Sequence, residues 1–317
     1  MKIIYQVFAI IFFTSLNFNA NSQCNFTTIN YLQELKDLNS ISSLDIEIIK
    51  SKKWSTNLLK AILDKTANIN QKRKKKFNAN IRVTYPFGFC EHKAKVRIHG
   101  DWKDHLTKDY ASLDVKLLDG NIGNIVKFKL LLPATRHSDA EIMITSLFHE
   151  VDIIAPKTIY LDVNLNNNPL KTFLFQEKIA KELIESNNRK EGPIFEGDES
   201  IMWTESSSFN EIFQNEKISL SRQLNKKWKN SNSSTQYISA KANQSIQKSY
   251  LIARSSGLKS FQPFLTTYNT KQKQIWQKYY LIMLASNSIH GLSLHNNKFY
   301  WDSFSDSFQP VYYDGNA

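Results

Sequence analysis

A block of alternating apolar and polar residues, from about residue 81 to residue 131, constrains the fold more than any other feature. Segments such as "IRVTYPF" and "KAKVRIHG" place apolar side chains at every second position, as half-buried β-strands do. "SLDVKLL" and "NIVKFKLLLP" continue the block, with turns expected at Gly88, Gly100-Asp101 and Asp119-Gly120. The pattern therefore predicts that this part of the protein is rich in strands.

Helical patterns lie on both sides of this block. Residues 26–70 are predicted to be helical and polar, and "DAEIMITSLFHEV" and "KQIWQKYYLIMLASNSI" have the spacing of buried helices. Between the last two segments, "TIYLDVNL" and "KTFLFQEK" are predicted strands joined by an "NNNP" turn. The predicted class is α+β, with a β-rich first part and a more helical second part.

The first residues are typical of an export signal. Lys2 is followed by the apolar run "IIYQVFAIIFF" and by small residues in "ANSQ", which favours cleavage before Gln23. An uncleaved anchor is the alternative, and no later segment is apolar enough to span a membrane. We expect a cleavable signal peptide at 1–22, a helical and polar region at 23–80 and one domain at 81–317, in a secreted, periplasmic or cell-envelope protein.

Two cysteines remain after this cleavage, Cys24 and Cys90. An exported protein can join them in a single disulfide. The other interpretation is a mobile Cys24 near the new N-terminus and a buried Cys90, and the sequence does not decide between the two. Their spacing is not that of a zinc site.

The chain of 317 residues has a net charge of +12, which suits an anionic partner. The densest basic run is "QKRKKK", and no nucleic-acid-binding motif accompanies it. We therefore expect no nucleic acid partner and favour a solvated basic face, with an anionic surface polymer as the other interpretation.

The C-terminal stretch "HGLSLHNNKFYWDSFSDSFQPVYYDGNA" carries the strongest chemical signal. A polar loop follows a buried helix, and the strands "KFYW" and "QPVYY" are joined by the turn "DSFSDS". This hairpin brings Asn296 and Asp314 close together, and amide and carboxylate oxygens are the ligands that magnesium prefers. Each pair, Asn296-Asn297 or Asp314-Gly315, is alone equally typical of a turn. Their coincidence at the two ends of one hairpin favours a site.

Residues 94–317 resemble the CotH kinase-like family, atypical protein kinases first known from spore coats. The segments that carry the resemblance are "KVRIHGDWKDHL", "SLDVKL", "TIYLDVNLNNNPLKTFLFQEKI", "HNNKFYW" and "FQPVYYDGN". The resemblance implies a two-lobed atypical protein-kinase-like fold, with a β-rich first lobe and a more helical second lobe. It also implies binding of ATP with Mg²⁺ and phosphorylation of hydroxyl groups on a secreted or surface protein.

The resemblance assigns a role to six positions of this chain. By it, Asn296 and Asp314 are magnesium ligands, Lys116 contacts phosphate, Glu177 orients Lys116 or a second metal, and Arg97 and Gly100 lie at the nucleotide lid.

The chain departs from the family pattern at three points. The aspartate expected about five residues before the loop asparagine is absent, and Gly291 stands there beside His290. His290 is the candidate replacement base, and His290 with His295 is a second candidate metal pair. The early turn has one glycine rather than several. Asp314 falls almost at the end, so we expect the domain to be truncated at its C-terminus.

These departures support a second hypothesis from another class. The protein would then be a non-catalytic, pseudokinase scaffold in the assembly of the cell envelope, the extracellular matrix or a surface polysaccharide.

Overall fold

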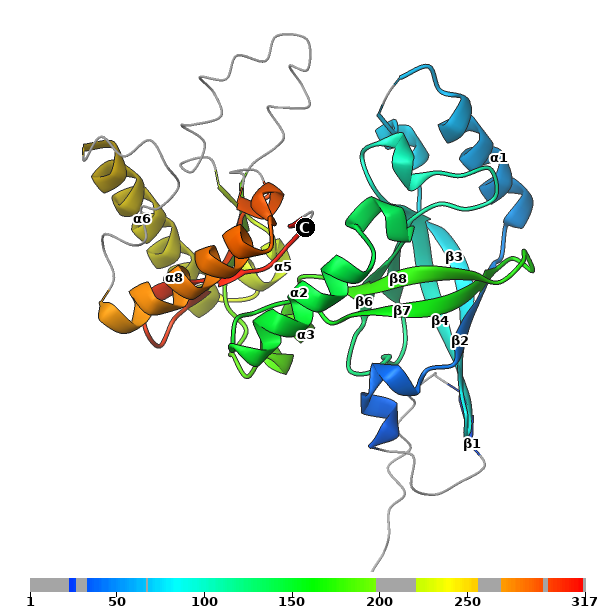
Figure 1. The fold of residues 1–317 in the computed structure, drawn as a ribbon, viewed down its shortest axis with the longest axis horizontal. Coiled ribbons are helices and arrows are strands. Elements are labelled where there is room, and N and C mark those ends of the chain that lie inside the picture. The colour runs from blue at the N-terminus through cyan, green and yellow to red at the C-terminus, as the bar shows by residue number, and fades with distance from the viewer. Residues whose placement is uncertain are drawn as a thin grey trace, which may run out of the picture.

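The computed structural model describes residues 23–26, 33–66, 68–197, 221–255, 269–292 and 296–315. A strand-rich part lies on the right of Figure 1, and α5, α6 and α8 lie on the left. The segment expected to be a signal peptide, residues 1–22, is outside the described residues. No helix within the described ranges is both long enough and apolar enough to cross a membrane.

Seven strands of the first part form a closed barrel. Hydrogen-bonded neighbours follow the order β4, β3, β2, β7, β8, β6 and β5, and β5 pairs back to β4. The pairing of β2 with β7 is parallel and the others are antiparallel. The strands are β2 Ser43–Ile48, β3 Phe77–Tyr85, β4 Gly88–Ile98, β5 Leu113–Leu117, β6 Lys127–Leu131, β7 Thr158–Leu165 and β8 Lys171–Glu177.

Strand β4 closes the barrel because its two halves have different partners along one edge. Its first residues, 88–91, pair with β1 (Gln23–Phe26), and residues 94–98 pair with β5. Its other edge pairs with β3 along most of its length. The alternating burial along β4 directs every second side chain inward, as the sequence pattern predicts.

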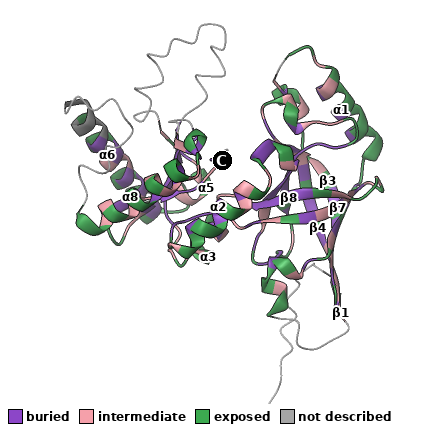
Figure 2. Ribbon diagram, viewed as in Figure 1, coloured by how far each residue is buried: buried purple, intermediate pink, exposed green. Residues whose placement is uncertain are grey.

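The barrel interior is a packed apolar core. The rings of Phe128 and Phe175 stack there with centroids 4.6 Å apart, and both side chains are fully buried. Trp54 of α1 (Ser51–Leu63) belongs to the same buried core and packs edge-on against Phe77, with centroids 5.4 Å apart. Buried residues run along the barrel strands in Figure 2, whereas α1 is largely exposed.

The second part packs two helices against a C-terminal hairpin. Phe148 of α2 lies 5.4 Å from Tyr279 of α8 and 5.0 Å from Tyr312, which follows the hairpin, measured between ring centroids. The Trp276 indole of α8 donates a hydrogen bond of 2.8 Å to the Phe308 carbonyl. The elements are α2 Asp139–Glu150, α3 Lys181–Ser186, β9 Ile194–Glu196, β10 Arg222–Gln223, α5 Lys226–Lys229, α6 Ser233–Ser255, α8 Thr270–Ala285, β11 Lys298–Asp302 and β12 Ser307–Val311.

Short 3-10 helices connect these elements. They are η1 Glu34–Lys36, η2 Leu38–Ser40, η3 Gln71–Arg73, η4 Lys103–His105, η5 Pro133–Arg136 and η8 Ile289–Leu292. Two of them, η5 and η8, contain Arg136 and His290, which both lie close to Asp314.

The expectation of a two-lobed kinase-like fold is wrong. The strands expected to form a β-rich lobe close into a seven-stranded barrel, which does not match that fold. Closure requires β2, and β2 comes from residues 26–70, where the sequence predicted helix. The helical expectation holds for Ser51–Leu63 and fails for Ser43–Ile48, whose buried positions alternate as in a strand.

Several local predictions are confirmed. Strands occupy the alternating block, the two strands flanking "NNNP" pair as β7 and β8, and α8 covers most of its predicted segment. The C-terminal hairpin also forms, with Lys298 opposite Val311.

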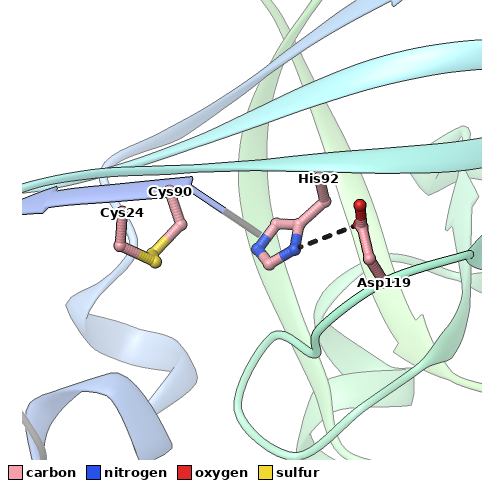
Figure 3. Close-up of a disulfide and its surroundings, with 4 residues drawn as sticks. All are labelled: Cys24, Cys90, His92 and Asp119. Atoms are coloured by element: carbon pink, nitrogen blue, oxygen red, sulfur yellow. Dashed lines mark ion pairs between the residues drawn. A yellow bond between two sulfur atoms is a disulfide. The ribbon is translucent and has the colours of Figure 1, made fainter. Parts of the chain in front are cut away.

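The two cysteines form a disulfide. Cys24 of β1 lies directly opposite Cys90 of β4 in the antiparallel register, and the bond joins residues 66 positions apart. Figure 3 shows the disulfide with His92 and Asp119 nearby. Nδ1 of buried His92 is 3.9 Å from the Asp119 carboxylate, and burial lowers the pKa of His92. The disulfide therefore fixes β1 to the barrel strand that closes the fold.

Reduction of this disulfide is expected to lower the free energy of unfolding by about 2–4 kcal/mol, because the cross-link restricts a long segment of the unfolded chain. Urea unfolding of the chain expressed from Gln23, with and without a phosphine reductant, measures the difference. The Cys24→Ser variant should be as unstable as the reduced protein and insensitive to reductant. Equal stability of the oxidised and reduced wild type would contradict the expectation.

Candidate functional site

The C-terminal hairpin brings three of the predicted site residues together. Asn296 precedes β11 and Asp314 follows β12, so both lie at the same end of the hairpin. The amide nitrogen of Asn296 is 2.8 Å from Nε2 of His290, and that Nε2 is 3.9 Å from the Asp314 carboxylate. Asn296 and Asp314 are buried, whereas the His290 side chain is 46% exposed. His295 lies outside the described residues.

Arg136 forms a buried ion pair with Asp314. It ends η5, directly after the barrel strand β6, and its guanidinium is 3.0 Å from the carboxylate. Burial lowers the pKa of Arg136, but the neighbouring Asp314 carboxylate more than offsets it, so the pKa is raised. The ion pair therefore joins the barrel to the end of the hairpin.

The backbone at this junction has unusual dihedral angles. His137 and Ser138, which follow Arg136, have φ values of 51° and 53°, and Asp314 has a φ of 47°. Positive φ disfavours side chains with a Cβ, and such strain persists where surrounding contacts enforce it. The backbone is therefore strained directly after Arg136 and at Asp314 itself, the two partners of the ion pair.

Lys129 of β6 adds a second buried cation. Its ammonium group donates a hydrogen bond of 3.2 Å to the Tyr313 hydroxyl and lies 4.4 Å from the centre of that ring. Within the described ranges, no carboxylate lies within 4.0 Å of this ammonium group. Burial and the nearby Arg136 lower the pKa of Lys129 to about 8. Among the described residues, Lys129 therefore has no carboxylate as a direct partner, although Asp314 and Asp114 are close enough to act on its pKa.

Lys298 contacts the same tyrosine ring. Its ammonium group is 4.2 Å from the centre of the Tyr313 ring and is also ion-paired with Glu196 of β9. The Tyr313 ring therefore contacts two ammonium groups, directly before Asp314 in the chain. The electrostatic environment of Asp314 is predominantly cationic.

A buried network below this cluster holds the hairpin against the barrel. The Tyr312 hydroxyl donates to Glu141 of α2 at 2.6 Å, and the Gln176 amide of β8 donates to the same carboxyl group at 2.7 Å. Glu141 is fully buried, and burial raises its pKa. The Gly315 backbone N–H donates to the Tyr312 hydroxyl at 3.3 Å. Asp314 is thus flanked by two tethered residues.

Lys116 and Arg97 lie on the outer face of the barrel, away from the Asp314 contacts. Lys116 of β5 is exposed and opposes Lys95 and Lys127 in the strand register. Arg97 of β4 is ion-paired with Asp114 at 2.6 Å. The structure therefore does not bring Lys116, the predicted phosphate ligand, or Arg97, predicted to lie at the nucleotide lid, into contact with Asp314, where Lys129 and Arg136 lie instead.

Gly100 is required for close packing. Its φ is 92°, and a Cβ at this position would lie 1.9 Å from the ring of His105. His105 is buried, its Nδ1 is 2.9 Å from the Ser112 hydroxyl, and burial with the nearby Arg136 lowers its pKa to about 4. The absence of a side chain at Gly100 thus makes room for an uncharged histidine.

Glu177 lies away from Lys116. It opposes Phe128, whose side chain fills the barrel, so Glu177 faces the inner side of β8. One carboxylate oxygen is 3.4 Å from the Lys157 backbone N–H, and the other has no hydrogen-bond partner among the residues described. Burial raises the pKa of Glu177 to about 7. Glu177 therefore does not orient Lys116, and the cation that acts on its pKa is Lys157.

Lys129, Arg136 and Lys298 were not predicted from the sequence, and Asn297 was named only as part of the Asn296-Asn297 pair. Asn297 is fully buried, and neither atom of its amide has a hydrogen-bond partner in the described part of the chain. Such a group costs about 1–3 kcal/mol. The alternation of "VKFKLLL" indicates that Lys129 faces outward, but it does not indicate what that face contacts.

The donor atoms fit a magnesium ion that also binds phosphate. Within the described ranges, no group of three His, Cys, Asp or Glu side chains is close enough to hold a metal ion alone. Magnesium often uses one or two protein carboxylates and takes its other ligands from water and substrate phosphates. Asp314 supplies a carboxylate, and Asn296, whose amide contacts the same histidine as Asp314, supplies an amide oxygen. The next residue, Asn297, has a buried amide without a hydrogen-bond partner in the described part of the chain.

No protein-family model matches this chain, and no curated protein is significantly similar to it. The resemblance to the CotH kinase-like family therefore depends on the quoted motifs. Any function must be argued from the site itself.

Glu177→Gln is expected to make stability less dependent on pH. The folded state holds the Glu177 proton up to about pH 7 and the unfolded state only to about 4.5, so wild-type stability falls as the pH rises between these values. Glutamine resembles the protonated acid, and the variant should gain up to about 3 kcal/mol over the wild type by pH 7.5. Urea unfolding from pH 4.5 to 7.5 measures this gain.

The exposed Glu47 of β2 provides the control. Glu47→Gln should follow the wild-type pH profile. A Glu177→Gln profile parallel to that of the wild type would contradict the raised pKa.

Asn297→Leu is expected to raise the free energy of unfolding by about 1 kcal/mol, because it replaces an unpartnered buried amide with an apolar group of similar size. Asn57→Leu is the matched control, since the Asn57 amide is also buried but donates 2.7 Å to the Arg73 carbonyl. That control should be destabilised. Equal destabilisation of both variants in urea unfolding would show that the Asn297 amide has a partner.

Proposed function

We propose that the protein binds Mg²⁺ with ATP at the Asp314 site and transfers a phosphoryl group to a hydroxyl of a secreted or surface protein. The observation that carries the proposal is the pair of buried cations, Lys129 and Arg136, close to the Asp314 carboxylate, with the Asn296 amide at the same end of the hairpin. Phosphoryl transfer depends mainly on positioning and charge neutralisation, and this set of groups suits both tasks. ATP and the protein substrate come from the family resemblance.

Each side chain has a role in this proposal. Lys129 and Arg136 bind phosphate oxygens, and Asp314 with Asn296 or Asn297 holds the metal ion. Magnesium would neutralise charge on the phosphates and fix their geometry. Because Arg136 is paired with Asp314, it contacts the phosphates only if this ion pair is shared or opened.

His290 is the proposed proton acceptor. Its ring is partly exposed and lies beside both Asn296 and Asp314, so a hydroxyl from outside can reach it. In the transfer, the substrate oxygen bonds to the γ-phosphorus, the bond to the β–γ bridging oxygen breaks, and the hydroxyl proton passes to His290. ADP carries away the electron pair of the broken bond.

The proposed location is outside the cytoplasm. The Cys24–Cys90 disulfide supports it, because disulfides persist in oxidising compartments. The N-terminal sequence, with its apolar run and small residues, supports it independently.

A non-catalytic scaffold is the second candidate. The observation in its favour is that Arg136 already neutralises Asp314 and that the Asn296 amide already contacts His290. The Asp314 carboxylate therefore already has a cationic partner, and the Asn296 side chain is already held through its amide nitrogen. The aspartate of the family's catalytic loop is also missing, since Gly291 stands at that position.

Mg²⁺ and ATP together are expected to raise the melting temperature of the chain expressed from Gln23, and neither alone should do so. At about 100 times the dissociation constant, the ligand adds about 2.7 kcal/mol to the free energy of unfolding, which is a shift of several degrees. Asp314→Asn, which keeps the shape of the side chain, should abolish the shift, and Lys129→Met should reduce it. Differential scanning fluorimetry measures both effects.

Asp306→Asn is the control, because Asp306 is an exposed carboxylate on the turn of the same hairpin, paired with Lys241 at 2.5 Å. Mg²⁺ and ATP together should raise the melting temperature of this variant as much as that of the wild type. No shift in the wild type, or an equal shift in Asp314→Asn, would reject the nucleotide site and leave the scaffold. Binding without transfer of labelled γ-phosphate to added protein substrates would favour a pseudokinase.

A further inference from the structure

Three lysines lie opposite one another across three neighbouring strands on the outer face of the barrel. Lys95 of β4 opposes Lys116 of β5, and Lys116 opposes Lys127 of β6. Like charges placed directly opposite in a sheet are destabilising. Within the described part of the chain, none of these lysines has a carboxylate within 4.0 Å. The arrangement therefore costs stability and is not compensated locally.

The lysine row lines a cavity of about 490 Å³ with a strong excess of positive charge. Six of its lining side chains are lysine or arginine, and Asp114 is the one carboxylate among them. Asp114 is already paired with Arg97 at 2.6 Å and with Lys178 at 2.7 Å. Burial raises the pKa of Asp114, but Lys178 and Arg97 more than offset it, so the pKa lies below its usual value. Because Asp114 is already paired with these two cations, it does not neutralise the charge of the lysine row.

The lysine row is continuous with the Asp314 site. Asp114 directly opposes Lys129, and Lys129 reaches Tyr313, the residue before Asp314. Lys116 and Asp114 alternate on the same outer face of β5, as do Lys127 and Lys129 on β6. A chain bound along the lysine row can therefore extend along one face of the barrel towards Asp314.

We propose that this face binds an extended polypeptide segment rich in aspartate and glutamate. Carboxylates on alternate residues of an extended segment are about 7 Å apart, and the lysines of neighbouring strands are about 5 Å apart, within the reach of flexible side chains. The described residues that line the cavity include no aromatic ring, which argues against nucleobases because they bind by stacking. Compact ammonium groups suit a series of separate carboxylates.

If the Asp314 site transfers phosphate, the acidic segment marks the substrate and places a nearby hydroxyl at His290. That step rests on the proposed function, whereas binding of the acidic segment does not. An experiment can therefore reject phosphate transfer without rejecting binding of the acidic segment, and the reverse.

The test is binding of a fluorescein-labelled peptide of about 12 residues, with alternating glutamate and serine, to the chain expressed from Gln23. Fluorescence anisotropy at 50 mM salt should show saturable binding that weakens strongly at 200 mM salt. Lys95→Gln/Lys116→Gln/Lys127→Gln should weaken binding at least about tenfold, because it removes three ion pairs. Its melting temperature should equal or exceed that of the wild type, because like-charge repulsion is removed.

Lys52→Gln/Lys53→Gln/Lys60→Gln is the matched control, since it removes the same charge from exposed positions on α1. It should bind the acidic peptide as the wild type does. Equal weakening in both triple variants would overturn the proposal, because general charge attraction would then explain binding. Tighter binding of a polyuronate than of the peptide would also overturn it, in favour of an anionic polysaccharide.

The measurement is made without nucleotide and repeated with Asp314→Asn. Peptide binding retained in Asp314→Asn supports the docking surface whether or not Mg²⁺ and ATP bind. Loss of peptide binding in Asp314→Asn, with the lysine row intact, would overturn the docking surface as a separate site.

Discussion

The buried carboxyl group of Glu141 joins the three parts of the molecule that make the candidate site. It lies on α2 and accepts hydrogen bonds from Gln176 of the barrel and from Tyr312 at the end of the hairpin. The hydroxyl of Tyr312 in turn accepts a hydrogen bond from Gly315. Asp314, between these two residues, is held by the contacts of its neighbours and by its own ion pair with Arg136. A buried network of this kind is stabilising only when its members are satisfied, so the site depends on all of them.

The charges around Asp314 explain why this region suits a ligand. Arg136 has a carboxylate partner, whereas the polar contacts of buried Lys129 within the described residues are with the hydroxyl and ring of Tyr313. Burial of an ammonium group without a carboxylate is unfavourable, and the lowered pKa of Lys129 reflects the same cost. An anionic ligand would supply the missing charge. The lysine row on the outer face is a second excess of positive charge, and there solvent screens the repulsion between the ammonium groups.

The local elements could be predicted from the sequence, and the closure of the barrel could not. Alternation at 81–131 identifies strands, and the turn residues of the C-terminal hairpin identify its two ends. Closure depends on the parallel pairing of β2 with β7 and on the pairing of β4 with β5. The first joins segments more than 100 residues apart, and no periodicity within either strand indicates its partner. The alternation of apolar and polar residues therefore does not predict that the sheet closes into a barrel.

Alternation identifies a strand but not what the strand contacts, and this explains which site residues could be predicted. Asn296 and Asp314 are brought together by one hairpin, and that contact is local enough to be inferred from turn and strand signals. Lys116 and Lys129 both occupy outward positions on barrel strands, so alternation cannot distinguish them. Only the position of the hairpin against β6 decides that Lys129 contacts Tyr313. The disulfide was likewise undecided until the register placed Cys24 opposite Cys90.

A phosphotransferase proposal does not require a kinase fold, because the chemistry depends on the site and not on the scaffold around it. The decisive interaction is the Arg136–Asp314 ion pair. A metal–phosphate ligand must share or open this pair, which is unfavourable, but it also gives Lys129 a direct anionic partner, which it does not have among the described residues. If the second effect is larger, the site binds ligand and His290 is positioned to act. If the ion pair is stronger, the same residues act as a structural connection between barrel and hairpin, as a scaffold requires.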